Sequence, residues 1–122
     1  MKEPIFIVEG GSDAMALITM GFDYVIGRAS CNSGAEQIKS VLKKIKASRV
    51  IIVADNDSVK SGGIRPGIEG AKKLKKELGY NSIIIMTPSP IKDLRQMLNK
   101  VGAETARKII NSQVNSGIWR KE

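Results

Sequence analysis

Residues 50–57 read Val-Ile-Ile-Val-Ala-Asp-Asn-Asp, an uninterrupted apolar run that ends in two acids separated by one residue. A continuous apolar run of this length is typical of a strand buried on both faces, as in a parallel sheet covered by helices. Because side chains alternate along extended chain, Asp55 and Asp57 are expected to project to the same side. The stretch therefore predicts a buried parallel strand that carries a pair of carboxylates at its carboxyl end.

Three further apolar runs, at 5–8, 24–26 and 83–86, alternate with helical patterns in the rest of the chain. Helices are expected at about 13–20, after Ser33, and at about 66–78, 92–98 and 103–114. Ser12 is the expected N-cap of the first helix, and Ser33 with Glu36 has the spacing of a capping box for the second. The alternation predicts an α/β fold, a compact Rossmann-like domain with a central parallel sheet of about four strands flanked by helices.

The composition limits the chemistry that this chain can perform. Its 122 residues (13.2 kDa) suit one compact domain, and 42% hydrophobic content is enough for a core. There is no His and only one Cys, Cys31, which excludes a disulfide framework, a zinc site with several Cys or His ligands, and His-dependent catalysis. The sequence has no apolar run of membrane-spanning length, so a cytoplasmic protein that does not enter membranes is expected.

Acidic residues follow three of the predicted strands. Glu9 ends the first, Asp55 and Asp57 end the third, and Asp93 follows the fourth after a short loop. Parallel strands end at one edge of a sheet, and that edge is where ligands bind in such folds. Carboxylate oxygens are suitable ligands for Mg²⁺, which stabilises the charge that develops in phosphoryl transfer. Asp and Asn also begin ordinary turns, so the hypothesis depends on the three sets together.

Two segments near these acids resemble the signatures of the Toprim domain. Residues 7–17, Ile-Val-Glu-Gly-Gly-Ser-Asp-Ala-Met-Ala-Leu, resemble the first signature, and 51–57 with the later Gly67 resemble the second. Lys92-Asp93-Leu94 is similar to a lysine-aspartate step found in primases. The resemblance spans about residues 5–98. The Toprim domain is shared by topoisomerases of types IA and II, bacterial-type primases, OLD-family nucleases and RecR recombination proteins.

The resemblance implies roles for individual residues. Glu9 would act as general acid/base or metal ligand, Asp55 and Asp57 would bind Mg²⁺ (or Mn²⁺), and Asp93 would help to hold a second metal. Lys92 would neutralise phosphate, with a surface salt bridge as the alternative. Because Arg95 stands where primases often have another acid, the sequence departs from a complete second metal site.

Two positions beside Glu9 have open interpretations. Gly10 would let the backbone approach a phosphate, although a short glycine pair is weak evidence by itself. Asp13 lies one helical turn after Glu9, where it would cap or orient the site or would be an ordinary charge at a helix N-terminus.

Residues 54–57 and 65–71 look most like the Toprim domains of primases from phages, plasmids and other mobile elements. We therefore expect residues 1–122 to be a single Toprim domain, with its core at about 4–98 and a C-terminal helix and tail at 99–122. It would be a module of a larger primase, a nucleotidyltransferase that makes RNA primers for DNA replication. DNA, nucleotides, and other primase, helicase or replication proteins would be its partners. The alternatives are an OLD-like nuclease that uses the same carboxylates, and a non-catalytic nucleic-acid-binding module.

The net charge of +8 is concentrated in the middle of the chain. Residues 39–76 contain eleven of the 20 Lys and Arg residues but only three acids, and many of the lysines fall in two predicted helices. Lys43 and Lys72 represent these helices as candidates for phosphate contact, although such runs more often mark a solvated helix face. With two Phe, two Tyr and one Trp, the chain offers no aromatic platform for stacking unpaired bases.

Overall fold

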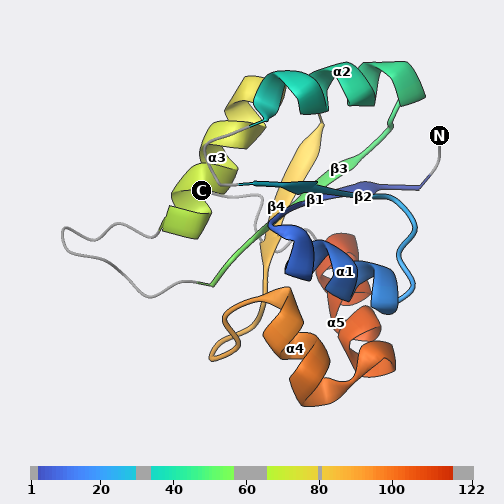
Figure 1. Cartoon of the computed structure of the whole chain (residues 1–122), viewed down its shortest axis with the longest axis vertical. Helices are drawn as coiled ribbons and strands as arrows, with labels where there is room; N and C mark the ends of the chain where they lie inside the picture. The colour runs from blue at the N-terminus through green and yellow to red at the C-terminus, as the bar shows by residue number, and fades with distance from the viewer. Residues whose placement is uncertain (1–2, 30–33, 57–65, 80, 117–122) are drawn as a thin grey trace.

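The computed structural model describes residues 3–29, 34–56, 66–79 and 81–116. This part of the chain forms four strands and five helices that alternate up to the last two helices (Figure 1). Along the chain they are β1 (Ile5–Glu9), α1 (Gly11–Thr19), β2 (Val25–Arg28), α2 (Ala35–Ile45), β3 (Val50–Ala54), α3 (Pro66–Leu78), β4 (Ser82–Met86), α4 (Leu94–Val101) and α5 (Ala103–Ser116).

The strands form one sheet in the order β2-β1-β3-β4, and every neighbouring pair is parallel. Ile5 is opposite Val50, and Val50 is opposite Ser82, so β1, β3 and β4 start together and end at the same edge. Helices connect the parallel strands, as a crossover requires. The predicted α/β class and the four-stranded parallel sheet are confirmed.

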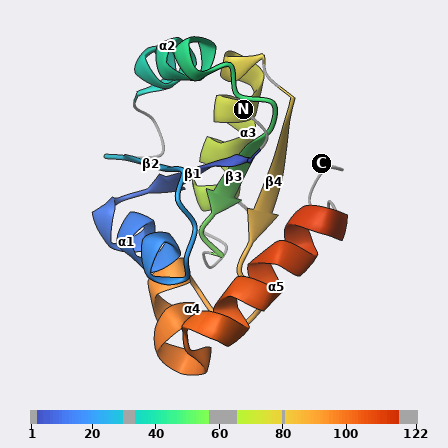
Figure 2. The same ribbon diagram turned by 90° about the vertical axis from the view of Figure 1, so that its right-hand side faces the viewer.

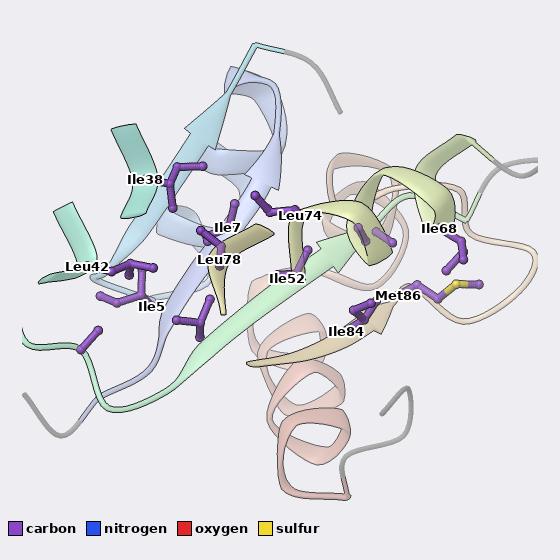
Figure 3. Close-up of a cluster of buried hydrophobic side chains, with 14 residues drawn as sticks. Ile5, Ile7, Ile38, Leu42, Ile52, Ile68, Leu74, Leu78, Ile84 and Met86 are labelled. Atoms are coloured by element: carbon purple, nitrogen blue, oxygen red, sulfur yellow. The ribbon is translucent and has the colours of Figure 1, made fainter. Parts of the chain in front are cut away.

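Helices cover both faces of the sheet. α2 and α3 lie on one face, and α1, α4 and α5 lie on the other (Figures 1 and 2). The strands supply both cores because their side chains alternate: Ile5 and Ile52 pack under α2 and α3, whereas Phe6 and Ile51 pack against α1, α4 and α5. Figure 3 shows the first of these two cores. Among the described residues, no helix is both long and apolar enough to cross a lipid bilayer.

Glycines, not serines, begin the first two helices. α1 starts at Gly11 with Gly10 as its N-cap, and α2 starts at Ala35 with Gly34 as its N-cap; neither cap makes a side-chain hydrogen bond. Both glycines have positive φ, 85° and 83°, which turns the chain sharply at little steric cost. The expected caps at Ser12 and Ser33 are therefore wrong, and Ser33 itself lies outside the described residues.

Apolar residues recur at helical spacing along α2, which predicts one buried stripe formed by Ala35, Ile38, Val41, Leu42 and Ile45. This stripe is only partly buried. Ile38 and Leu42 are 4% and 0% exposed, but Val41 and Ile45 are 43% and 38% exposed. Helix α5 continues to Ser116, two residues beyond its predicted end, and buries Ala106 and Ile110 against the sheet. The C-terminal helix is therefore part of the second core and not an appendage to it.

Candidate metal and catalytic site

The carboxyl ends of β1 and β3, which are neighbouring strands, bring Glu9 and Asp55 to one edge of the sheet. Both residues are half-buried. They line a narrow cleft of about 10 Å³ together with Arg28 and Gly67. A cavity of that volume holds about one water-sized occupant. Two predicted site residues therefore face a space of the size of a small ion, while Asp57 lies outside the described residues.

Asp13 joins this site from the first turn of α1, where its side chain is 5% exposed. Its carboxylate accepts the Arg95 backbone N–H at 3.3 Å, and the Asp55 side chain lies close enough to lower the pKa of Asp13. Burial raises the pKa of Asp13, and the charge of Asp93 raises it further, against the lowering effect of these contacts. The spacing Glu9-x₃-Asp13 was the available signal, but it did not predict burial or contact with Asp55.

Asp93 lies at the same edge, where it begins α4. Its side chain accepts the Gln96 backbone N–H at 2.8 Å, so it is the N-cap of the helix. The Gln96 side chain in turn accepts the Lys92 backbone N–H at 2.7 Å. Asp93 therefore has a structural role, and a metal-binding role for this residue remains a prediction.

Asn56 connects the end of β3 to the loop that follows β4. Its backbone N–H donates to the Lys92 carbonyl oxygen at 2.7 Å, and its side-chain amide donates to the Thr87 carbonyl at 2.9 Å and the Ser89 hydroxyl at 3.1 Å. These bonds hold Asp55 and Asp93 at a fixed separation on the edge. Sequence reasoning treated Asn56 only as a possible turn residue.

Within the described ranges, no three acidic, His or Cys side chains lie close enough together to hold a metal ion. The donors at the edge are nevertheless carboxylate oxygens, the ligand type that hard cations such as Mg²⁺ prefer. Glu9 and Asp55 face one small cleft, and burial disfavours the negative charge of the neighbouring Asp13. The carboxylate oxygens of Glu9 and Asp55 therefore fit a divalent cation, which would share the cleft with the cationic Arg28.

The remaining candidate residues occupy two different places. The Gly10 N–H donates to the Arg28 carbonyl at 2.7 Å, so this amide is engaged in the backbone and the residue contributes its turn conformation. Lys92 is exposed at the carboxylate edge. Lys43 and Lys72 lie on α2 and α3, and they are not lining residues of the cleft.

Two substitutions test the capping role of Asp93 in the absence of metal. Asp93→Ala is expected to destabilise the fold by about 1 kcal/mol, because it leaves the Gln96 N–H without its cap. Asp93→Asn keeps an oxygen that accepts this hydrogen bond, so its cost should be much smaller. Urea denaturation in EDTA measures both, and equal losses from the two variants would contradict the capping role.

Asp13→Asn is expected to stabilise the metal-free protein at neutral pH. The pKa of Asp13 is raised above its ordinary value of 3.8, so the unfolded chain loses this proton first as the pH rises. Native stability should therefore fall from about pH 3.8 upward until the native carboxyl also ionises. The stability gap between variant and wild type should open over that range, as urea denaturation at several pH values in EDTA would measure. A gap that is the same at every pH would contradict this account.

Comparison with known proteins places the chain in a family. The Toprim-like family matches residues 6–98, which is most of the chain, so the chain belongs to that family. No curated protein sequence matches it.

Two solved structures are similar in fold. One is the DnaG primase catalytic domain bound to single-stranded DNA (TM-score 0.63, 21% identity), and the other is the DnaG catalytic core (TM-score 0.68, 19% identity). Each alignment covers 93% of this chain but only 38% and 34% of those chains, respectively. The chain thus spans little more than a third of the primase structures that it resembles.

Proposed function

We propose that this chain is the Toprim catalytic module of a DNA primase, and that it supports Mg²⁺-dependent nucleotidyl transfer. The observation that carries the proposal is the pairing of Glu9 and Asp55 on neighbouring parallel strands, around one ion-sized cleft, in a chain of the Toprim-like family. The similarity in fold to primase catalytic domains supports primer synthesis as the reaction.

In this proposal Glu9, Asp55 and Asp57 hold Mg²⁺ or Mn²⁺, and Asp93 contributes to a second metal position. A cation held there would supply positive charge to the phosphoryl oxygens, the chemistry that such metals provide in phosphoryl transfer. Glu9 can also accept or return a proton as general acid/base, since it terminates a strand and is only half-buried. Lys92, exposed at the same edge, attracts the phosphates of the incoming nucleotide.

Asp13 and Asn56 act on the site through Asp55. Asp13 lies beside the Asp55 side chain and would limit the directions in which that carboxylate can point. Asn56 anchors the adjacent backbone to the Lys92 carbonyl and thereby to the loop that carries Asp93. We assign both as positioning residues, because a site on fixed elements keeps its ligands in productive geometry.

The partners proposed are a DNA template and nucleotides, together with other primase, helicase or replication domains. The similar primase chains are more than twice as long as this one, which leaves room in such proteins for template binding outside the Toprim domain. A nuclease would use the same carboxylates for hydrolysis, so the reaction must be distinguished by its product.

One assay distinguishes these functions. The chain is incubated with Mg²⁺ or Mn²⁺ and labelled single-stranded DNA, with and without nucleoside triphosphates, alone and together with a template-binding primase domain. Primer extension that requires nucleotides supports the proposal. Shortening of the DNA without nucleotides supports a nuclease, and DNA binding without either product, unchanged in Asp55→Asn, supports a non-catalytic module.

A further inference from the structure

One layer of the molecule carries a concentration of lysines that the carboxylate site does not use. α2 and α3 are in contact on one face of the sheet (Figure 1). Together with the C-cap of α2 they contain eight lysines and only three acids. We call this surface the lysine face; its lysines are Lys39, Lys43, Lys44, Lys46, Lys72, Lys73, Lys75 and Lys76.

The positive charge of the seven lysines within α2 and α3 is not neutralised by ion pairs with the acids around them. Lys43, Lys44, Lys73 and Lys76 are exposed. Among the described residues, Lys108 and Glu104 on α5, in the opposite layer, lie within salt-bridge distance, and none of those seven lysines is in such a pair. Lysines that lie three or four positions apart on one helix, such as Lys72 and Lys76, repel each other and destabilise it by roughly 0.2–0.5 kcal/mol per pair. A bound polyanion would relieve this repulsion.

The lysine face begins next to the carboxylate edge. α3 follows β3, and its second residue, Gly67, lines the cleft with Asp55. At a rise of 1.5 Å per residue, Lys72 lies about 8 Å and Lys76 about 14 Å along the helix axis from Gly67. A phosphate chain that leaves the cleft over α3 would therefore meet lysines at successive helical turns.

The chemistry of the face favours a duplex over a single strand. Neither α2 nor α3 contains an aromatic residue, so the face offers no ring on which an unpaired base could stack. Lysines alone recognise backbone charge, which is densest in a double helix. We propose that the lysine face binds the phosphate backbone of a nucleic-acid duplex, namely the primer–template product that leaves the carboxylate site. The inference rests on the proposed function, because that reaction supplies the duplex.

The test measures duplex binding at several salt concentrations in EDTA. Fluorescence anisotropy with a labelled RNA–DNA duplex compares wild type with Lys43→Gln/Lys76→Gln and with the matched control Lys100→Gln/Lys108→Gln, which removes the same charge from the opposite layer. If both lysines contact phosphate, the slope of log K against log[NaCl] should fall in magnitude by about 1.8, and affinity at 0.1 M salt by roughly 50-fold. The control should lose about threefold or less, and Lys43→Arg/Lys76→Arg should bind like wild type.

Three results would overturn the inference. Equal slopes of log K against log[NaCl] for the two Gln double variants would mean that duplex binding depends only on the net charge of the protein. Tighter binding of a single strand of the same length would exclude a duplex site, and equally strong competition by poly-L-glutamate would indicate an acidic protein partner.

Asp55→Asn separates the two proposals, since it should leave duplex binding in EDTA unchanged. If Asp55→Asn loses nucleotidyl transfer but Lys43→Gln/Lys76→Gln keeps the wild-type slope of log K against log[NaCl], only the lysine-face proposal is rejected. If Asp55→Asn keeps full nucleotidyl transfer, the proposed function is rejected.

Discussion

Asp55→Asn is expected to lower Mg²⁺-dependent nucleotidyl transfer by roughly 10³-fold while leaving the fold intact. Asp55 is half-buried at the end of the central strand β3 and faces the same cleft as Glu9. Asn keeps the shape of the side chain but removes the negative charge that would hold a divalent cation. Primer synthesis by the chain together with its template-binding domain measures the effect on activity.

Metal affinity is a second property that Asp55→Asn should change. Calorimetric titration with Mn²⁺ should show an affinity loss of more than about tenfold, since even outer partners of metal ligands are typically worth 10–100-fold. Asp23→Asn is the matched control, because Asp23 is an exposed acid just before β2 and lines a different pocket. The assignment fails if Asp23→Asn and Asp55→Asn change Mn²⁺ affinity equally.

Leu42→Ala is expected to destabilise the protein by about 3 kcal/mol. Leu42 is completely buried and belongs to the core between α2 and the sheet (Figure 3). Removing its side chain takes away apolar contacts and leaves a cavity that its close-packed neighbours fill only partly. Guanidinium denaturation should show a lower midpoint with an unchanged slope.

The adjacent residue supplies the control for this prediction. Val41 lies on the same helix but is 43% exposed, so Val41→Ala should change stability by less than about 1 kcal/mol. The sequence pattern placed both residues on one apolar stripe, and only the structure separates them. Comparable losses from the two variants would show that Val41 is also buried in solution.

The strands and their order of alternation with helices could be predicted from the sequence. Strands β1, β3 and β4 are buried almost throughout, which leaves continuous apolar runs such as 50–53, whereas the edge strand β2 is only half-buried. Parallel pairing then requires that the strands end at one edge. The placement of Glu9 and Asp55 on that edge follows from the same argument. These features depend only on local composition and on the rule that parallel strands end at one edge of a sheet, so they can be predicted from a single sequence.

Contacts between distant segments could not be predicted in this way. Asp13 is buried because α4 packs against α1 and directs the Arg95 N–H toward it, an interaction across 82 positions of sequence. The glycine caps were missed because serine is the commoner signal, whereas Gly10 and Gly34 achieve the turn by their positive φ. Val41 is exposed because α2 turns only part of its stripe toward the core.

The hydrogen bonds of Asn56 have a consequence for how such a domain could be modified. They fasten the chain immediately after Asp55 to the Lys92 and Thr87 carbonyls, which belong to another part of the fold. Asn56 is therefore an anchor to preserve when the sequence beyond the proposed metal ligands is exchanged. A graft that keeps Asp55, Asn56 and Asp57 and replaces residues after them should leave the carboxylate of Asp55 in register with Glu9. Such an exchange should keep the proposed metal-binding chemistry.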